Sequence, residues 1–260
     1  MVNSALGREV AGIIGNLIAL GLFLSPLPTF HSIYKKGEVK EYSPLPYIVT
    51  LLNCLLWVYY GKVHPNSLLV IIINAIGIVI QFSYVVFYFI YANKKQRRFV
   101  ACLSLIEIAI FILVVLLCSL IPSSTKHWDI AVVTGIACDL VNIAMYVMPC
   151  LAIYKVYRTK SLEYMPFWLS LFSFVNGGFW LVYGLLPVDL YIILSNGIGC
   201  ALGVIQMSVI GYYFFKYPQP KDYISLPEYP NWLKFWKSRE NKIADEKAGE
   251  GGQVEISDMV

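Results

Sequence analysis

Long apolar stretches dominate this chain, and short polar segments separate them. Seven stretches have roughly 18 or more residues, which is about the length a helix needs to cross a lipid bilayer. They cover about residues 10–33, 45–62, 67–91, 99–121, 130–154, 166–186 and 190–214. A transmembrane barrel would instead show short segments of alternating polarity. The pattern therefore predicts an all-α integral membrane protein with seven transmembrane helices.

Composition supports a membrane protein over a soluble domain. Of the 260 residues, 58% are hydrophobic and only 14% are charged, and the mean hydropathy is +0.65. A soluble domain of this length carries far more charged surface. The first apolar stretch is too long for a cleavable signal and runs into Pro26 and Pro28, so we interpret it as the first span.

Basic residues gather on alternate sides of the predicted spans. They follow spans one, three and five and continue into the C-terminal segment: Lys35, Lys36, Lys40, Lys94, Lys95, Arg97, Arg98, Lys155, Arg158, Lys160 and Lys216. The opposite side has only Arg8, Lys62 and Lys126. Since cytosolic loops carry the excess of Lys and Arg, we expect an extracellular or lumenal N-terminus and a cytosolic C-terminus.

A set of residues occurs twice along the chain. Asn53, Trp57, Tyr60, Gly61 and Asn74 recur with nearly the same spacing as Asn176, Trp180, Tyr183, Gly184 and Asn196. A repeat of this kind indicates two structurally related halves. Each half contains three spans, so two halves joined directly would insert in opposite senses. The fourth span restores the sense and gives a 3+1+3 arrangement of two parallel three-helix repeats.

The predicted organisation follows from this arrangement. The expected segments are an N-terminus (1–9), a first repeat (10–93), a linker with the inversion helix (94–125), a second repeat (126–215) and a cytosolic tail (216–260). Prolines exclude a long helix in the tail, and its end is charged and glycine-rich, so we expect the tail to be mostly disordered.

Several motifs together resemble the SWEET family of sugar transporters, the nodulin/saliva-domain proteins, of the plant two-repeat type. The motifs are Gly15-Asn16, Leu24-Ser25-Pro26-Leu27-Pro28-Thr29-Phe30, Ser43-Pro44-Leu45-Pro46-Tyr47, Leu51-Leu52-Asn53-Cys54 and Lys160-Ser161-Leu162-Glu163-Tyr164-Met165-Pro166-Phe167. The resemblance covers about residues 10–215. It implies facilitated, bidirectional sugar transport without ATP. We therefore expect that the protein is not an enzyme and uses no cofactor.

Duplicated tryptophans and asparagines are the candidate substrate-binding residues. Trp57 and Asn74 lie at similar depth in spans two and three, and Trp180 and Asn196 repeat the geometry. An indole matches the apolar face of a sugar, and a carboxamide both donates to and accepts from hydroxyls. The candidates are completed by Asn53, Asn176 and Cys54, which line the same cavity or serve helix packing.

Prolines and tyrosines mark the two ends of this cavity. Pro26, Pro46, Pro149 and Pro166 lie toward the cytosolic end, where they act as hinges of an inner gate or, for Pro46 and Pro166, simply begin helices. At the other end the resemblance implies an outer gate. Its residues are Tyr60, Gly61, Gly135, Tyr183, Gly184 and Asp189. Tyrosine is also typical of membrane interfaces.

Other functions remain open at this stage. A seven-helix receptor matches the number of spans, and an adaptor protein would use the tail. Glu107 and Asp139 are intramembrane carboxylates, which are candidates for a proton relay in a proton-coupled sugar transporter. The six cysteines have no metal-ligand spacing, and nothing indicates nucleic-acid binding.

The expected partners are the sugar and the lipid bilayer, with a homo-oligomer implied by the resemblance. Trp57 and Trp180 narrow the cavity, which favours a glucose-like hexose over a disaccharide. Similarity to the plant branch that includes vacuolar hexose carriers favours the vacuolar membrane over the plasma membrane.

Overall fold

The computed structural model describes residues 2–121, 126–219 and 223, and this part of the chain is helical. The elements are α1 (Val2–Leu24), α2 (Leu27–Lys36), α3 (Leu45–Val63), α4 (Leu68–Tyr91), α5 (Lys94–Ser119), α6 (Lys126–Met145), α7 (Val147–Thr159), the short 3-10 helix η1 (Leu162–Tyr164), α8 (Phe167–Leu185) and α9 (Leu190–Lys216). The prediction of an all-α protein is confirmed. The predicted tail from residue 224 onward lies outside the described residues.

Six of the described segments are long and apolar enough to cross a membrane. They are Ser4–Lys36, Leu68–Tyr91, Lys94–Ser119, Asp129–Thr159, Phe167–Leu185 and Leu190–Lys216. Helix α3 is also 19 residues long but is not among the six, because Asn53, its aromatic residues and Lys62 lower its hydropathy. These helices define a multi-pass membrane protein.

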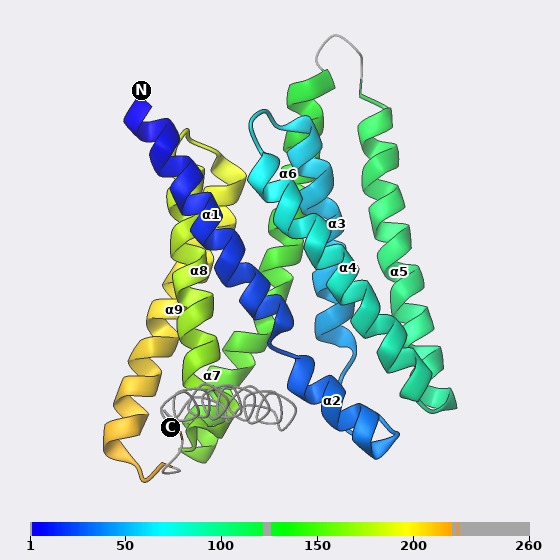
Figure 1. The fold of residues 1–260 in the computed structure, drawn as a ribbon, viewed down its shortest axis with the longest axis vertical. Helices are drawn as coiled ribbons and strands as arrows, with labels where there is room; N and C mark the ends of the chain where they lie inside the picture. The colour runs from blue at the N-terminus through cyan, green and yellow to red at the C-terminus, as the bar shows by residue number, and fades with distance from the viewer. Residues whose placement is uncertain (1, 122–125, 220–222, 224–260) are drawn as a thin grey trace, which may run out of the picture. The chain divides into compact units, whose positions relative to one another are not determined.

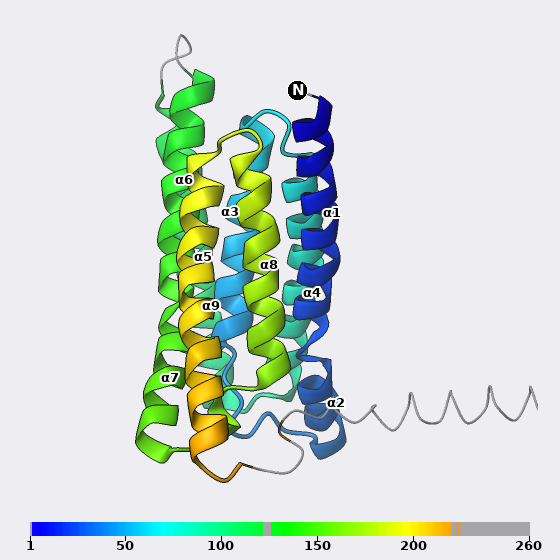
Figure 2. The same ribbon diagram turned by 90° about the vertical axis from the view of Figure 1, so that its left-hand side faces the viewer.

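The helices form two related groups with α5 at their side (Figures 1 and 2). Helices α1, α3 and α4 form one group, and α6, α8 and α9 form the other. The packing of α3 on α4 in the first group corresponds to the packing of α8 on α9 in the second. Likewise, the packing of α1 on α4 corresponds to that of α6 on α9. The groups meet where α1 packs on α8 and where α3 packs on α6, and α5 covers α3 and α6.

Two of the long apolar segments are broken near a proline. Helix α1 ends at Leu24 and α2 begins at Leu27, with Pro26 in between. Helix α6 ends at Met145 and α7 begins at Val147, two residues before Pro149. Proline lacks an amide hydrogen and its ring crowds the carbonyl four residues earlier, so a helix bends or ends at this point.

The two groups separate toward the end of the bundle that lies beyond these breaks. Helix α2 packs on α4, whereas α7 packs on α9 and η1. Each group has its own apolar cluster at this end. One cluster lies around Phe30 and Tyr84, and the other lies around Val156 and Met165. Figures 1 and 2 both show α2 and α7 on opposite sides of this end. The larger core joins the groups nearer the N-terminal end, where α1 meets α8.

Two glycines of α9 test how closely α8 and α9 pack. A Cβ atom on Gly203 would lie 2.5 Å from the Phe174 ring of α8, whereas one on Gly211 would meet nothing within 4 Å. We predict that Gly203→Ala lowers the unfolding temperature in detergent, because overpacking costs roughly 1–3 kcal/mol.

The matched control is Gly211→Ala, which we expect to leave the unfolding temperature unchanged or raise it, since alanine favours helix by about 1 kcal/mol over glycine. Equal unfolding temperatures for the two variants would contradict the tight packing at Gly203.

Candidate functional site

A central cavity of about 180 Å³ lies between the two groups of helices. Its lining includes six of the predicted substrate-binding residues: Asn53, Trp57, Asn74, Asn176, Trp180 and Asn196. The remainder of the lining is Ala19, Leu22, Phe23, Val70, Ile73, Asn142 and Ile192. The structure therefore brings the duplicated residues together around one space, with an equivalent set from each half.

The four duplicated carboxamides that line this cavity are held in two ways. Asn74 donates from Nδ2 to the Val70 carbonyl (2.8 Å), and Asn196 donates to the Ile192 carbonyl (2.9 Å). Each amide group is thus tied to its own helix through its donor. The Oδ1 atoms of Asn53 and Asn176 are buried without a hydrogen-bond partner. Buried unpaired acceptors are costly, so these oxygens suit a ligand that carries hydroxyl donors.

The two tryptophans pack in equivalent ways at the end of the cavity nearer the N-terminus. The Trp57 ring packs edge-on against Tyr60 (5.4 Å between ring centroids), and Trp180 packs edge-on against Tyr183 (5.2 Å). Gly15 of α1 lies so close to Trp180 that an added Cβ would be 3.1 Å from the indole nitrogen. The small residue lets α1 lie directly beside this indole.

Cys54 does not line the cavity, although we expected it there. Its side chain is fully buried, and its sulfur is 2.6 Å from the position of a Cβ added to Gly77 of α4. The residue therefore packs α3 against α4. Residues at successive positions of a helix face different directions, which explains why Asn53 reaches the cavity and its neighbour does not.

Asn142 of α6 lines the cavity, and the repeat could not have revealed it. At the offset of 123 residues that relates Asn16 to Asp139, the partner of Asn142 is Ala19, which also lines the cavity. The two halves thus contribute a carboxamide at one wall and a methyl group at the other. Because Asn142 is not duplicated, only the three-dimensional structure shows that it lines the central cavity.

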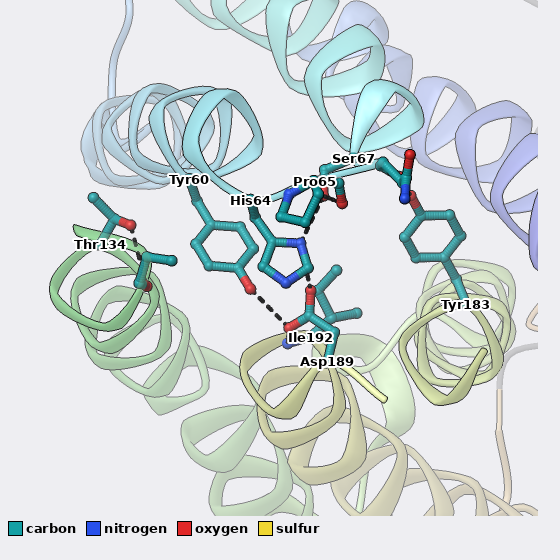
Figure 3. Close-up of polar contacts among 10 residues, drawn as sticks. Tyr60, His64, Pro65, Ser67, Thr134, Tyr183, Asp189 and Ile192 are labelled. Atoms are coloured by element: carbon teal, nitrogen blue, oxygen red, sulfur yellow. Dashed lines mark hydrogen bonds and ion pairs between the residues drawn. The ribbon is translucent and has the colours of Figure 1, made fainter. Parts of the chain in front are cut away.

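Tyr60 and Asp189 connect the two halves at the N-terminal end of the bundle (Figure 3). The Tyr60 hydroxyl donates to Oδ1 of Asp189 (2.8 Å), and the Ile192 amide donates to the same oxygen (3.2 Å). Tyr60 is fully buried and Asp189 is 3% exposed. A bond between groups this deeply buried closes the bundle above the central cavity.

Tyr183 makes a second connection at the same end, from the other half. Its hydroxyl donates to the Asn66 carbonyl in the α3–α4 loop (3.2 Å), and its ring is 2% exposed. The two tyrosines are repeat-related, yet one contacts a carboxylate and the other a backbone carbonyl. The predicted gate residues Tyr60, Tyr183 and Asp189 therefore all lie in one closed layer.

The three predicted gate glycines lie where helices approach closely. A Cβ on Gly61 would be 2.7 Å from Ile71, and one on Gly184 would be 2.8 Å from Ile192. A Cβ on Gly135 would be 2.4 Å from the Tyr191 ring. These contacts join α3 to α4, α8 to α9 and α6 to α9, so larger side chains would separate the helices that carry the closed layer.

His64 belongs to this layer and was not predicted from the sequence. Its ring stacks on Tyr60 (5.1 Å between centroids). Its Nδ1 lies 3.1 Å from the Ser67 hydroxyl and 3.6 Å from Oδ2 of Asp189. That second carboxylate oxygen has no hydrogen bond. A single histidine in a loop has no counterpart in the second half, so the repeat did not indicate it.

The four predicted hinge prolines lie away from this layer, toward the opposite end. Pro26 separates α1 from α2, and Pro149 lies in the first turn of α7. Pro46 is in the first turn of α3, and Pro166 precedes the first residue of α8. Pro26 and Pro149 thus adjoin breaks between helices. Pro46 and Pro166 lie at helix starts, which agrees with the alternative that they simply begin helices.

The two intramembrane carboxylates have different surroundings. Asp139 of α6 accepts a hydrogen bond from the Ser195 hydroxyl of α9. Glu107 of α5 is 5% exposed, and its Oε1 has no hydrogen-bond partner. Neither residue lines the central cavity. Asp139 therefore has a packing partner of its own within the second half.

These features define a class of protein: a helical membrane protein of two related halves around a central cavity lined by carboxamides, indoles and aliphatic side chains, which is the architecture of a transporter. Comparison with known proteins identifies the family. The model for the "sugar efflux transporter for intercellular exchange" family matches residues 9–96 and 132–221. The chain belongs to this family, the SWEET transporters, and not to a family of enzymes.

Individual relatives agree with this assignment. Bidirectional sugar transporter SWEET7 of Arabidopsis thaliana is 44% identical over 210 residues, which cover 80% of this chain and 81% of the relative. SWEET4 of the same plant is 42% identical over 221 residues, covering 84% and 87%. The solved structure of a eukaryotic SWEET transporter has a TM-score of 0.75 at 33% identity and covers 82% of this chain and 99% of that one.

The bond between Tyr60 and Asp189 leads to a prediction about stability. Tyr60→Phe keeps the ring but removes the hydroxyl that donates to the buried carboxylate. We expect a loss of about 1–3 kcal/mol and a lower unfolding temperature in detergent, because a buried acceptor loses its partner.

Tyr191→Phe is the control, since the Tyr191 ring packs edge-on against Tyr60 at 5.8 Å and none of the described hydrogen bonds uses its hydroxyl. If both variants unfold at the same temperature as the unaltered protein, the bond does not hold the halves together.

Proposed function

We propose that the protein is a facilitative, bidirectional sugar uniporter that moves its substrate down the sugar gradient by alternating access. The observation that carries the proposal is the cavity lined by three repeat-related pairs, Asn53 with Asn176, Trp57 with Trp180 and Asn74 with Asn196. Indole faces and carboxamides suit the apolar ring faces and the hydroxyls of a sugar. The names of the relatives, bidirectional sugar transporters, support the same substrate class.

The two ends of the bundle support alternating access. At the N-terminal end the halves are joined by the Tyr60–Asp189 bond, with Tyr183 and the three glycines as the remaining gate residues. At the other end α2 and α7 lie on opposite sides of the bundle (Figures 1 and 2). We therefore interpret the structure as a state that is closed at the first end. Rocking of the halves about the cavity, with the four prolines as hinges, would close the second end and open the first.

The proposed topology has seven spans, with α1 and α2 together forming the first and α6 and α7 together the fifth. The two segments that match the family model, on either side of α5, support a 3+1+3 arrangement. The positive-inside rule places the N-terminus on the extracellular or lumenal side, so the Tyr60–Asp189 layer is the outer gate. We further propose the vacuolar membrane and a homo-oligomer, as the family resemblance implied.

A glucose-like hexose is the proposed substrate. The cavity is small, about 180 Å³, and Trp57 and Trp180 both occupy its walls. A disaccharide would need more room between the two indoles than a single hexose ring does.

Uptake into proteoliposomes tests the site. Purified protein should take up radiolabelled glucose, with unlabelled glucose competing more strongly than sucrose. Asn74→Ala and Asn196→Ala should each reduce uptake by about tenfold or more, which corresponds to about 1.4 kcal/mol or more of lost binding.

Cys54→Ala is the control, since its thiol lies outside the cavity, and should retain uptake. Uptake unaltered in both asparagine variants would exclude the assigned site, and no uptake by the unaltered protein would favour a receptor or adaptor.

A pH gradient distinguishes uniport from proton coupling. With equal glucose inside and outside, we expect no net accumulation under an imposed pH gradient, and the same result for Asp139→Asn. Accumulation by the unaltered protein that the variant abolishes would instead show that Asp139 carries protons and that uniport is wrong.

A further inference from the structure

A second cleft, larger than the central cavity, opens at the N-terminal end of the bundle. It measures about 920 Å³ and lies between the first turns of α1, the start of α4 and the end of α8 with its following loop. None of its lining residues lines the central cavity. The cleft shares Tyr183 and Asn66 with the closed layer, but its other lining residues have no part in the proposed gate or substrate site.

Arg8 is the cation of this cleft, and its charge is poorly paired. The side chain is only 8% exposed, and its guanidinium carbon lies 4.3 Å from the centroid of the Tyr183 ring. Its Nε and Nη2 atoms are buried without a hydrogen-bond partner. Among the described residues, no carboxylate lies within ion-pair distance of it. A buried guanidinium of this kind favours an anionic acceptor supplied from outside the chain.

The rim of the cleft is apolar and faces outward. Leu68 is 66% exposed and Val188 is 69% exposed, and Ile13 and Leu185 are about half exposed. Four apolar segments suited to cross a membrane begin or end around this cleft, at Ser4, Leu68, Leu185 and Leu190. The Arg8 guanidinium, surrounded by exposed aliphatic side chains, provides the environment that a phospholipid phosphate and the start of its acyl chains require.

Glu9 adds a second charge to the same cleft. It follows Arg8 on α1, lines the cleft and is exposed. A net-negative lipid would meet repulsion from this carboxylate, whereas a zwitterionic headgroup offers an ammonium group to it and a phosphate to Arg8. The two neighbouring charges therefore match the two charges of one zwitterionic lipid.

We propose that this cleft binds a zwitterionic phospholipid of the leaflet on the N-terminal side, with the lipid phosphate accepting hydrogen bonds from Arg8 and the ammonium group facing Glu9. The long Arg8 side chain turns its donors from the Tyr183 ring toward the phosphate. Because Tyr183 also bonds the α3–α4 loop, the lipid occupies a place beside the closed layer. The proposal does not depend on which solute the protein transports.

Native mass spectrometry of the full-length protein tests the site. The detergent-solubilised protein is incubated with an equimolar mixture of phosphatidylethanolamine and phosphatidylglycerol, and the number and kind of retained lipids are measured. We expect one tightly held phosphatidylethanolamine on the unaltered protein. Arg8→Gln should bind it about tenfold or more weakly, the size of one lost charge-assisted hydrogen bond. Arg8→Lys keeps the charge and should be intermediate. Glu9→Gln should shift the preference toward phosphatidylglycerol.

Arg98→Gln is the matched control, because it removes an exposed cation from the basic segment before the fourth predicted span, and it should retain the lipid. Circular dichroism and the unfolding temperature of Arg8→Gln without added lipid verify that the variant is folded. Equal lipid retention by folded Arg8→Gln and the unaltered protein would overturn the proposal. A preference for phosphatidylglycerol in the unaltered protein would also overturn it. So would displacement of the lipid by millimolar inorganic phosphate, which would identify a site for free phosphate.

Discussion

The hydrogen bond between Tyr60 and Asp189 is the interaction on which the arrangement of the two halves depends. A carboxylate buried this deeply is shielded from water, so its partners must come from the protein. Asp189 takes one donor from the backbone of its own helix α9 and one from Tyr60 of α3 in the other half. The bond thus links chain segments 129 residues apart. Without it the carboxylate would lose its hydrogen bond to Tyr60 of the other half, and among the described residues of that half it would keep only the longer 3.6 Å contact with the His64 ring.

The same need for internal partners organises the cavity. Asn74 and Asn196 each use their donor on a carbonyl of the same helix, which fixes the carboxamide without a bond to another helix. Asn53 and Asn176 keep their oxygens unpaired. A structure built only for stability would have paired these groups across the halves. That both residues line the same cavity and keep an unpaired oxygen supports the proposed binding site over polar packing between helices.

Much of the fold and of the candidate site could be predicted from the sequence, because both depend on the length, hydropathy and repetition of its segments. The helical fold, the duplicated residues of the cavity and the equivalent positions of Tyr60 and Tyr183 all follow from apolar stretches about a membrane long and from residues that occur twice. Cys54 was misplaced because adjacent helical residues face different directions, which a repeat does not reveal. Asn142, His64 and Arg8 have no duplicated counterpart. Their roles arise only when α6, the α3–α4 loop and the start of α1 are placed against the other half.

The contrast between Asn142 and Ala19 has a consequence for how a solute sits in the cavity. Two identical halves would present the same wall after a half turn about the central axis, so a ligand would bind equally well in two poses. A carboxamide on one side and a methyl group on the other remove this degeneracy. For the proposed sugar substrate, which itself lacks twofold symmetry, this asymmetry favours one pose, and in the proposed alternating-access scheme the same pose is favoured from either mouth.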